Sequence, residues 1–250
     1  MEDKDYIKKY ECYSDIDPCI YNRINYTISD IDKCSFASYK RFIVVDVINN
    51  LILFVSKNTC RMGCIDIMNI TGKELEEIEP FINEADRLDW TDVCSKTQKL
   101  FDSFGINFGT NFYVSYDYRF VGLQSNVILH LHSVPLIFSK EGKPWIVLGM
   151  ISPGNANQLG KCVLHIENKS KLFQYNPDTN MWGQLDNVNL TDRERKVLAL
   201  TSQGLSTKEL SSKLPYSEAT LKKIKREIFQ KTSTQSITEA LTFCFNHNLM

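Results

Sequence analysis

Helix start signals recur at short intervals through the last 61 residues of the chain. Three segments place a Ser or Thr three residues before a Glu, so that the two side chains can satisfy backbone N–H groups at a helix start. These pairs are Thr191–Glu194, Ser206–Glu209 and Ser236–Glu239. Ser217 is a fourth N-cap candidate, Gly204 stands where a glycine ends a helix, and Pro215 prevents one helix from running into the next. The pattern predicts four short helices, at about 192–203, 207–213, 218–231 and 237–247.

The third of these helices separates apolar from basic side chains. At about 100° per residue, one narrow stripe faces inward, and it consists of Leu221, Ile224, Ile228 and Thr232. The opposite side carries Lys222, Lys223, Arg226 and Gln230. Lys225 falls on the flank, where its aliphatic stem can lie along apolar surface. A short helix, the four-residue turn 214–217 and a basic helix form a helix-turn-helix, whose second helix fits the DNA major groove.

The charge distribution supports a polyanionic partner for this region. The chain has a net charge of −1, but residues 186–250 carry ten Lys and Arg against seven Asp and Glu. The first 185 residues carry 19 against 23. We therefore expect two domains, 1–185 and 186–250, of which the second is basic.

The stretch from Leu190 to about Leu241 resembles the LuxR-type (GerE-type) helix-turn-helix of bacterial transcription regulators. The matching residues are Leu190-Thr191-x-Arg193-Glu194-x-x-Val197-Leu198, Gly204-Leu205-Ser206-x-Lys208-Glu209-Leu210, Leu214-x-x-Ser217-x-x-Thr220-Leu221-Lys222 and Ile228-x-x-Lys231. The resemblance implies a four-helix, all-α domain that binds double-stranded DNA. In the family the last helix often dimerises, whereas Ile237, Ala240, Leu241 and Cys244 here fit core packing equally well.

The resemblance also implies which side chains meet DNA. Thr220, Lys222, Lys223 and Arg226 would face it, and bases would be read from the set Ala219, Lys222, Lys223 and Arg226. Gln230 lies on the same side. Lys208 and the helix start at Ser206 and Thr207 would approach phosphates, with an affinity that falls as salt rises.

Three positions depart from the family pattern. Ile224 stands where His is usual, Glu227 where Asn is common, and Thr232 where Leu is usual. Glu227 places an anion beside the expected DNA face. These departures motivate an alternative function, a protein-interaction adaptor whose helix-turn-helix no longer reads DNA.

Strand signals dominate the first 185 residues. Residues 41–56 read as two strands around Asn49-Asn50, and further strands are expected at 111–122, 126–139 and 144–152. An additional hairpin is expected within 160–183. Between 57 and 105 the pattern is helical, over 72–86 and 89–105. The sequence thus predicts an α+β protein, with an antiparallel sheet and flanking helices followed by the all-α domain.

Two strands, a helical crossover and three antiparallel strands, over about 40–155, resemble the layout of a PAS sensor domain. That resemblance implies a unit that binds an unidentified small molecule or dimerises, and we expect residues 1–40 to add helices that serve as dimer contacts. The chain would act as a homodimer.

The residues suggest no cofactor. His130 and His132 share a strand face opposite the more apolar face of Val127, Leu129 and Leu131, so we expect the histidines on the outer side or at an interface, which disfavours haem ligation. "NTCRMGC" (58–64) lies too early for a flavin-adduct motif. The aromatic residues of the strands are expected to pack within the sheet.

No catalytic or metal site is expected either. Nucleophile–base pairs, phosphate loops and metal clusters are not recognisable in the sequence, so catalysis has no support. The eight cysteines are scattered and read as reduced thiols, and Cys60 and Cys64 lack a second ligand pair for zinc. With a charged N-terminus and no long apolar run, we expect a cytoplasmic protein without membrane contact.

Overall fold

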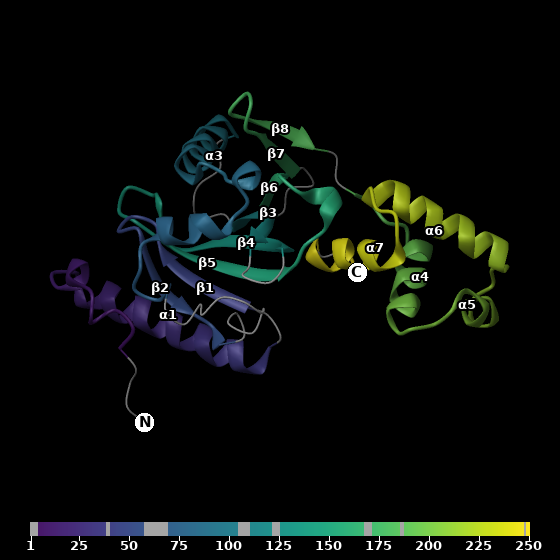
Figure 1. Cartoon of the computed structure of the whole chain (residues 1–250), viewed down its shortest axis with the longest axis horizontal. Coiled ribbons are helices and arrows are strands. Elements are labelled where there is room, and N and C mark those ends of the chain that lie inside the picture. Colours follow the sequence, from purple (N-terminus) through teal and green to yellow (C-terminus); the bar gives the residue numbers. More distant parts are fainter. Residues whose placement is uncertain are drawn as a thin grey trace. The chain divides into compact units, whose positions relative to one another are not determined.

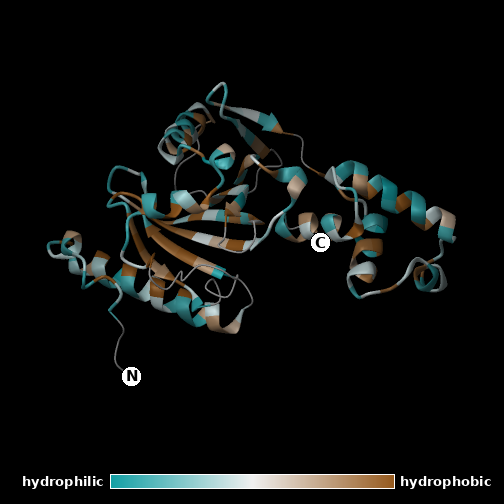
Figure 2. Ribbon diagram, in the orientation of Figure 1, coloured by the Kyte–Doolittle hydropathy of each residue, from teal (hydrophilic) through white to brown (hydrophobic). Residues whose placement is uncertain are grey.

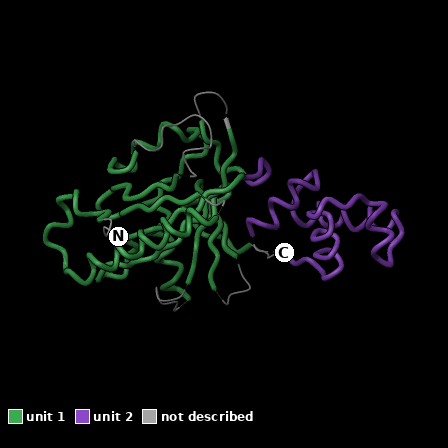
Figure 3. Tube along the Cα trace, turned by 90° about the horizontal axis from the view of Figure 1, so that it is seen from below, with its two compact units in different colours: residues 1–153, 159–185 green, residues 154–158, 186–250 purple. Residues whose placement is uncertain are grey.

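The computed structural model describes residues 5–38, 41–57, 70–104, 111–121, 126–167, 172–185, 188–247 and 249–250. The chain forms two compact units, one of residues 1–153 and 159–185 and one of residues 154–158 and 186–250 (Figure 3). None of the helices in the described ranges is long and apolar enough to cross a membrane. The rejected motif at 58–64, with Cys60 and Cys64, lies outside the described residues.

The first unit is built on one eight-stranded sheet, in the order β2-β1-β5-β4-β3-β6-β7-β8, with every neighbouring pair antiparallel (Figure 1). The strands are β1 Arg41–Asp46, β2 Leu51–Val55, β3 Phe112–Val121, β4 Asn126–Phe138, β5 Pro144–Pro153, β6 Cys162–Ile166, β7 Leu172–Asn176 and β8 Met181–Leu185. The predicted α+β class is confirmed. Beyond the predicted hairpin the sheet gains β8, whose sequence MWGQL contains only one strong strand former.

The helical segments of this unit are partly as predicted. They are α1 Pro18–Ala37, α3 Trp90–Phe104 and the short 3-10 helices η1 Glu11–Tyr13, η3 Leu75–Phe81 and η4 Glu84–Asp86. The helix expected over 72–86 is wrong, because that stretch is two 3-10 helices, with Pro80 in the first. Asn83 then starts the second by accepting a bond from the Ala85 N–H at 3.1 Å. Proline has no N–H to continue an α-helical ladder, and η3 ends one residue after it, at Phe81.

Helices pack on both faces of the sheet. Its strands are the most continuously hydrophobic part of the unit (Figure 2). Val93 and Phe101 of α3 pack with strand residues of one face, among them Leu129 and Leu164. Ile24 and Ile28 of α1 pack in a second cluster, whose strand residues are Phe42, Val44, Leu53, Phe54, Ile137 and Ile146. Burial of these side chains supplies the main stabilising term for the unit.

Three of the four histidines of the chain gather with an aspartate on the face opposite Leu129. His130 and His132 lie on the expected face. Of the two positions expected there, the outer side or an interface, a solvent-facing one is wrong for His130, which is 1% exposed. Its Nδ1 lies 2.7 Å from Oδ2 of Asp117, directly across the β3–β4 ladder. His132 is half-buried against the His130 ring, and His165 lies 3.0 Å from the Ser115 hydroxyl. Burial of His130 is tolerated because a carboxylate accompanies it.

The second unit contains four helices close to the predicted bounds: α4 Asp192–Ser202, α5 Thr207–Lys213, α6 Glu218–Thr232 and α7 Ile237–Asn246. The short η5 Ala156–Gln158 belongs to the same unit. Its core includes Val197, Leu198, Leu210, Leu214, Leu221, Ile224, Ile228, Ala240, Phe243 and Cys244. The cap at Ser236 differs in detail from a full box, because the Glu239 carboxylate accepts from the Gln235 N–H, at 3.0 Å.

Candidate nucleic-acid interface

The turn between α5 and α6 is set by three of its four residues. Leu214 leaves α5 in an extended conformation, with φ −116° and ψ 150°, and its side chain is buried. Pro215 follows, and Ser217 starts α6 by accepting a hydrogen bond from the Thr220 N–H at 3.2 Å. The Ser217 and Thr220 hydroxyls lie 2.9 Å apart. The turn is short, it ends at the Ser217 cap, and the buried Leu214 side chain anchors it in the core. It therefore fixes the direction of α6 relative to α5.

Three cations project from α6 into solvent. Lys222, Lys223 and Arg226 are exposed, and within the described part of the chain no hydrogen bond or ion pair engages their side chains. The predicted neighbours Ala219, Thr220 and Gln230 are exposed as well. The angular separation predicted from the sequence is therefore present on the folded helix. This exposed set, Ala219, Thr220, Lys222, Lys223, Arg226 and Gln230, is called the α6 outer face below.

The other two cations of the segment are held within the unit. Lys225 Nζ donates to the Thr207 hydroxyl at 3.1 Å, and burial lowers the pKa of its ammonium. Lys231 Nζ donates to Oε2 of Glu194 at 2.8 Å and to the Asn189 carbonyl at 3.0 Å. Thr207, expected to approach phosphate, is thus already bonded to Lys225. Three of the five cations remain for an outside partner.

The start of α5 is occupied by its own capping box. The Ser206 hydroxyl donates to Oε2 of Glu209 at 2.7 Å, and the Ser206 N–H donates to the same oxygen at 2.8 Å. These bonds lower the pKa of the Glu209 carboxyl, which therefore stays ionised. An anion already at this helix start competes with an incoming phosphate. The Lys208 side chain of the same helix is exposed.

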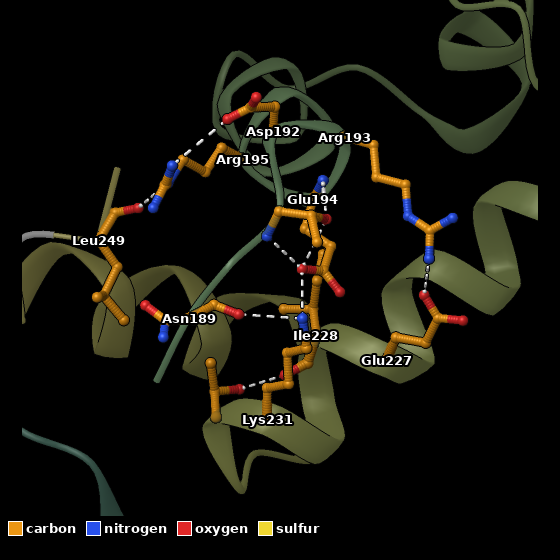
Figure 4. A network of polar contacts seen from close by, with 11 residues as sticks. Asn189, Asp192, Arg193, Glu194, Arg195, Glu227, Ile228, Lys231 and Leu249 are labelled. Carbon is orange, nitrogen blue, oxygen red and sulfur yellow. Dashed lines mark hydrogen bonds and ion pairs between the residues drawn. The ribbon is translucent and has the colours of Figure 1, made fainter. Parts of the chain in front are cut away.

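Two ion pairs tie α4 to α6 (Figure 4). Arg193 Nη2 donates to Oε2 of Glu227 at 2.7 Å, so the anion on α6 is neutralised from α4. Glu194 is 1% exposed and pairs with Lys231. Burial by itself would raise the pKa of Glu194, but bonds from Lys231 and Thr191 outweigh it and hold that pKa below its usual value. The sequence reveals Glu194 as a cap, whereas its partner lies 37 residues further along the chain.

The other two departures from the family pattern are internal. Ile224 is 2% exposed and packs in the core of the unit. Thr232 is 1% exposed, and its hydroxyl donates to the Ile228 carbonyl at 2.8 Å and lies 2.8 Å from the Thr234 hydroxyl. The polar atom of Thr232 is therefore satisfied, and no buried hydroxyl is left to weaken the end of α6.

Comparisons with known proteins assign a family to the second unit. Residues 188–244 match the family described as bacterial regulatory proteins, luxR family. Response regulator Rre1 of Synechocystis is 40% identical over 62 residues, which span 25% of this chain and 27% of that protein. The resemblance thus covers about a quarter of the length of the curated relative.

Among solved structures, a phage VqmA–DPO complex is 13% identical, with coverage of 92% of this chain and 91% of that one and a TM-score of 0.30. The Vibrio cholerae VqmA dimer is also 13% identical, with 89% and 88% coverage and a TM-score of 0.30. Similarity at that level is too low to define the fold.

Proposed function

Because residues 188–244 form a luxR-family helix-turn-helix domain, we propose that the chain is a bacterial transcription regulator that binds duplex DNA through the α6 outer face. The observation that carries the proposal is the division of the α6 cations. Lys225 and Lys231 are bonded inside the unit, whereas Lys222, Lys223 and Arg226 stand exposed on one side. A helix that is held by ion pairs to α4 and that presents cations on its exposed side is suited to bind in the DNA major groove.

Each of these residues has a defined role in the proposal. Lys222 and Lys223 neutralise phosphates and release counterions, which makes binding weaken as salt rises. Arg226 presents a planar fork of donors that matches the acceptors of a guanine edge. Ala219, Thr220 and Gln230 flank the cations and complete the reading surface, and Lys208 contacts the backbone.

For the first unit we propose a sensing or dimerising role. The support is a sheet with helices on both faces, laid out in the order of a PAS domain, preceding a DNA-binding domain. A dimer would bind two half-sites about one helical turn apart.

The three residues that motivated the adaptor hypothesis no longer support it. Ile224 and Thr232 are buried with internal roles, and the Glu227 charge is neutralised by Arg193. Each of the three departures is compensated inside the unit, with the outward cations intact. DNA binding is therefore the better account of this surface.

The experiment is a fluorescence-anisotropy titration of the whole protein against duplexes selected from a genomic fragment library. We expect Lys222→Glu with Arg226→Glu to weaken binding at least a hundredfold, because two contacts become repulsive. A matched control, Arg23→Glu with Lys99→Glu, makes the same change in net charge at exposed positions of the first unit and should bind within about threefold of the unmodified protein. Absence of binding by the unmodified chain at low salt, or equal binding by all three proteins, would contradict the proposal.

A further inference from the structure

The two edges of the eight-stranded sheet differ in how the chain protects them. At the β2 edge, the Ile52 N–H donates to the Lys73 carbonyl at 2.9 Å, and the Gly72 N–H donates to the Ile52 carbonyl at 2.7 Å. A third bond joins the Leu75 N–H to the Asn50 carbonyl at 3.2 Å. The outward N–H and carbonyl of Ile52 in β2, and the Asn50 carbonyl just before the strand, are therefore paired within the chain.

Within the described ranges of the chain, the β8 edge has no such cover. Among the residues that the structure describes, β8 pairs with β7 alone and lies last in the sheet. Its sequence, MWGQL, has no charged residue and no proline, and its register with β7 runs without a bulge. Met181 is 64% exposed and Leu185 is 37% exposed. Natural proteins protect edge strands with charges, prolines or bulges, and an unprotected edge is a template for another strand.

The residues of β8 are arranged symmetrically about Gly183. Successive side chains alternate between the faces of a strand, so Met181, Gly183 and Leu185 share one face. If two copies of β8 pair antiparallel about Gly183, Met181 of one copy lies opposite Leu185 of the partner subunit. A two-fold dimer requires a surface that is complementary to itself in this way.

A hollow of about 310 Å³ beside Gly183 provides room for those side chains. It is lined by Met181 and Leu185 of β8 and by Gln174 and Asn176 of β7, among others. A Cβ added at Gly183 would have its nearest neighbour, the Gln174 carbonyl oxygen, at 3.9 Å. No neighbour among the described residues therefore requires a glycine here. Facing glycines would let the apolar side chains of two copies close over the centre of the pair.

We propose that β8 is a dimerisation edge, which pairs antiparallel with β8 of a second copy of this chain and joins the two sheets into one. This inference deepens the dimer of the proposed function and rests on it. With about 3.4 Å per residue along a strand and about 4.8 Å between strands, the two Leu185 Cα atoms would lie about 14 Å apart. The chain continues from Leu185 into the second unit. Both DNA-binding domains would thus be tethered close together, as two half-sites one helical turn apart require.

The test is sedimentation equilibrium of full-length protein without DNA, on two double variants of the same positions. Met181→Lys with Leu185→Lys places like charges opposite each other across the proposed register, and the dissociation constant of the dimer should rise at least tenfold. Met181→Lys with Leu185→Glu places opposite charges face to face in that register only, and should dimerise within about threefold of the unmodified chain. A control, Val47→Lys with Ile48→Lys, alters two exposed apolar side chains that follow β1, outside residues 1–40, and should leave the dissociation constant unchanged.

Three results would overturn the inference. The unmodified chain could be monomeric at about 100 µM, the Lys/Lys variant could dimerise normally, or both β8 variants could weaken the dimer equally. The last result would also reveal simple damage to the sheet, since both variants expose similar side chains. Sedimentation without DNA tests the dimer independently of DNA binding. A protein that dimerises and does not bind DNA would refute only the proposed function. A protein that binds DNA as a monomer would refute only the dimerisation edge at β8.

Discussion

At the scale of the residue, the Glu194–Lys231 pair makes the second unit sensitive to acid. The pKa of Glu194 in the folded chain lies below its usual value, because bonds from Lys231 and Thr191 outweigh its burial. Its contribution to stability is therefore complete above about pH 4.3, the pKa in an unfolded chain, and is lost as pH falls through the folded-state pKa. We expect Glu194→Gln to cost about 1–2 kcal/mol of unfolding free energy at pH 7 and much less near pH 2. Urea melts followed by helical circular dichroism at both pH values test this. A loss independent of pH would contradict it.

A second residue-scale prediction concerns the anion on α6. Glu227 occupies the Arg193 guanidinium in an ion pair, so Glu227→Gln should leave that guanidinium available to DNA. We expect affinity to rise about two- to tenfold at low salt, with a salt dependence steeper by about one phosphate contact. Anisotropy titrations between about 50 and 200 mM salt measure both quantities. Glu84→Gln, an exposed change in the first unit, is the matched control, and an unchanged salt slope in Glu227→Gln would count against the idea.

Residues also show what sequence reasoning can reach. The inward Leu221 stripe and the outward Lys222 and Arg226 follow from helical periodicity, which is a local property of the chain. The partners of Glu227 and Lys231 are fixed only when α4 packs on α6, 34 and 37 residues away along the chain. The sequence therefore predicts the α6 outer face well, but it does not reveal which cations form hydrogen bonds or ion pairs within the unit.

At the scale of the element, replacement by alanine should change the free energy of unfolding differently at Ser206, the N-cap of α5, and at Ser212, inside the helix. Ser206 caps the helix, so Ser206→Ala should cost about 1 kcal/mol. Ser212 lies inside it and donates to the Lys208 carbonyl at 3.2 Å, a bond that gives little, and alanine is the better helix former. Ser212→Ala should therefore be neutral or stabilise by up to about 0.5 kcal/mol. Thermal melts of the two variants decide, and equal losses would mean that the cap plays no special part.

Another element-scale prediction concerns the attachment of the N-terminal segment to the sheet. Asp46, at the end of β1, is fully buried and accepts hydrogen bonds from the Tyr13 hydroxyl and from the Trp145 indole N–H, the latter at 2.9 Å. Asp46→Ala leaves those donors without their acceptor, and we expect a cost of about 1–3 kcal/mol. Tyr13→Phe removes a donor instead and should cost less. Chemical denaturation of both variants compares them, and a larger loss in Tyr13→Phe would contradict this view of the site.

Elements differ in how far sequence predicts them, for physical reasons. The four helices of the second unit carry their own caps and breakers, so their bounds are predicted within about a residue. The 3-10 stretch at 75–86 keeps a helical pattern but contains Pro80. The sequence of β8 contains few residues that favour a strand, and β8 forms because it pairs with β7 through backbone hydrogen bonds. Only the folded sheet therefore reveals it.

At the scale of the whole molecule, the division into two units predicts a DNA-binding domain that folds alone. The hydrophobic core of the second unit draws every member from residues 188–249. We expect a fragment of residues 186–250 to be helical by circular dichroism and to melt cooperatively. If the fragment is unfolded, the domain depends on the rest of the chain, and this prediction is wrong.

The same fragment distinguishes the contribution of the α6 outer face to DNA binding from the contribution of dimerisation through β8. It retains the α6 outer face and lacks β8, so it should bind a duplex with a single half-site about as tightly as the full chain does. On a duplex with two half-sites the full chain gains from a second, intramolecular binding event, and the fragment should bind about ten- to a hundredfold more weakly. Full-length protein with Met181→Lys and Leu185→Lys should behave as the fragment does, because it loses the proposed pairing and keeps the domain. Anisotropy titrations of all three proteins on both duplexes test the prediction. If the three proteins bind the two-site duplex equally, dimerisation through β8 plays no part in DNA recognition.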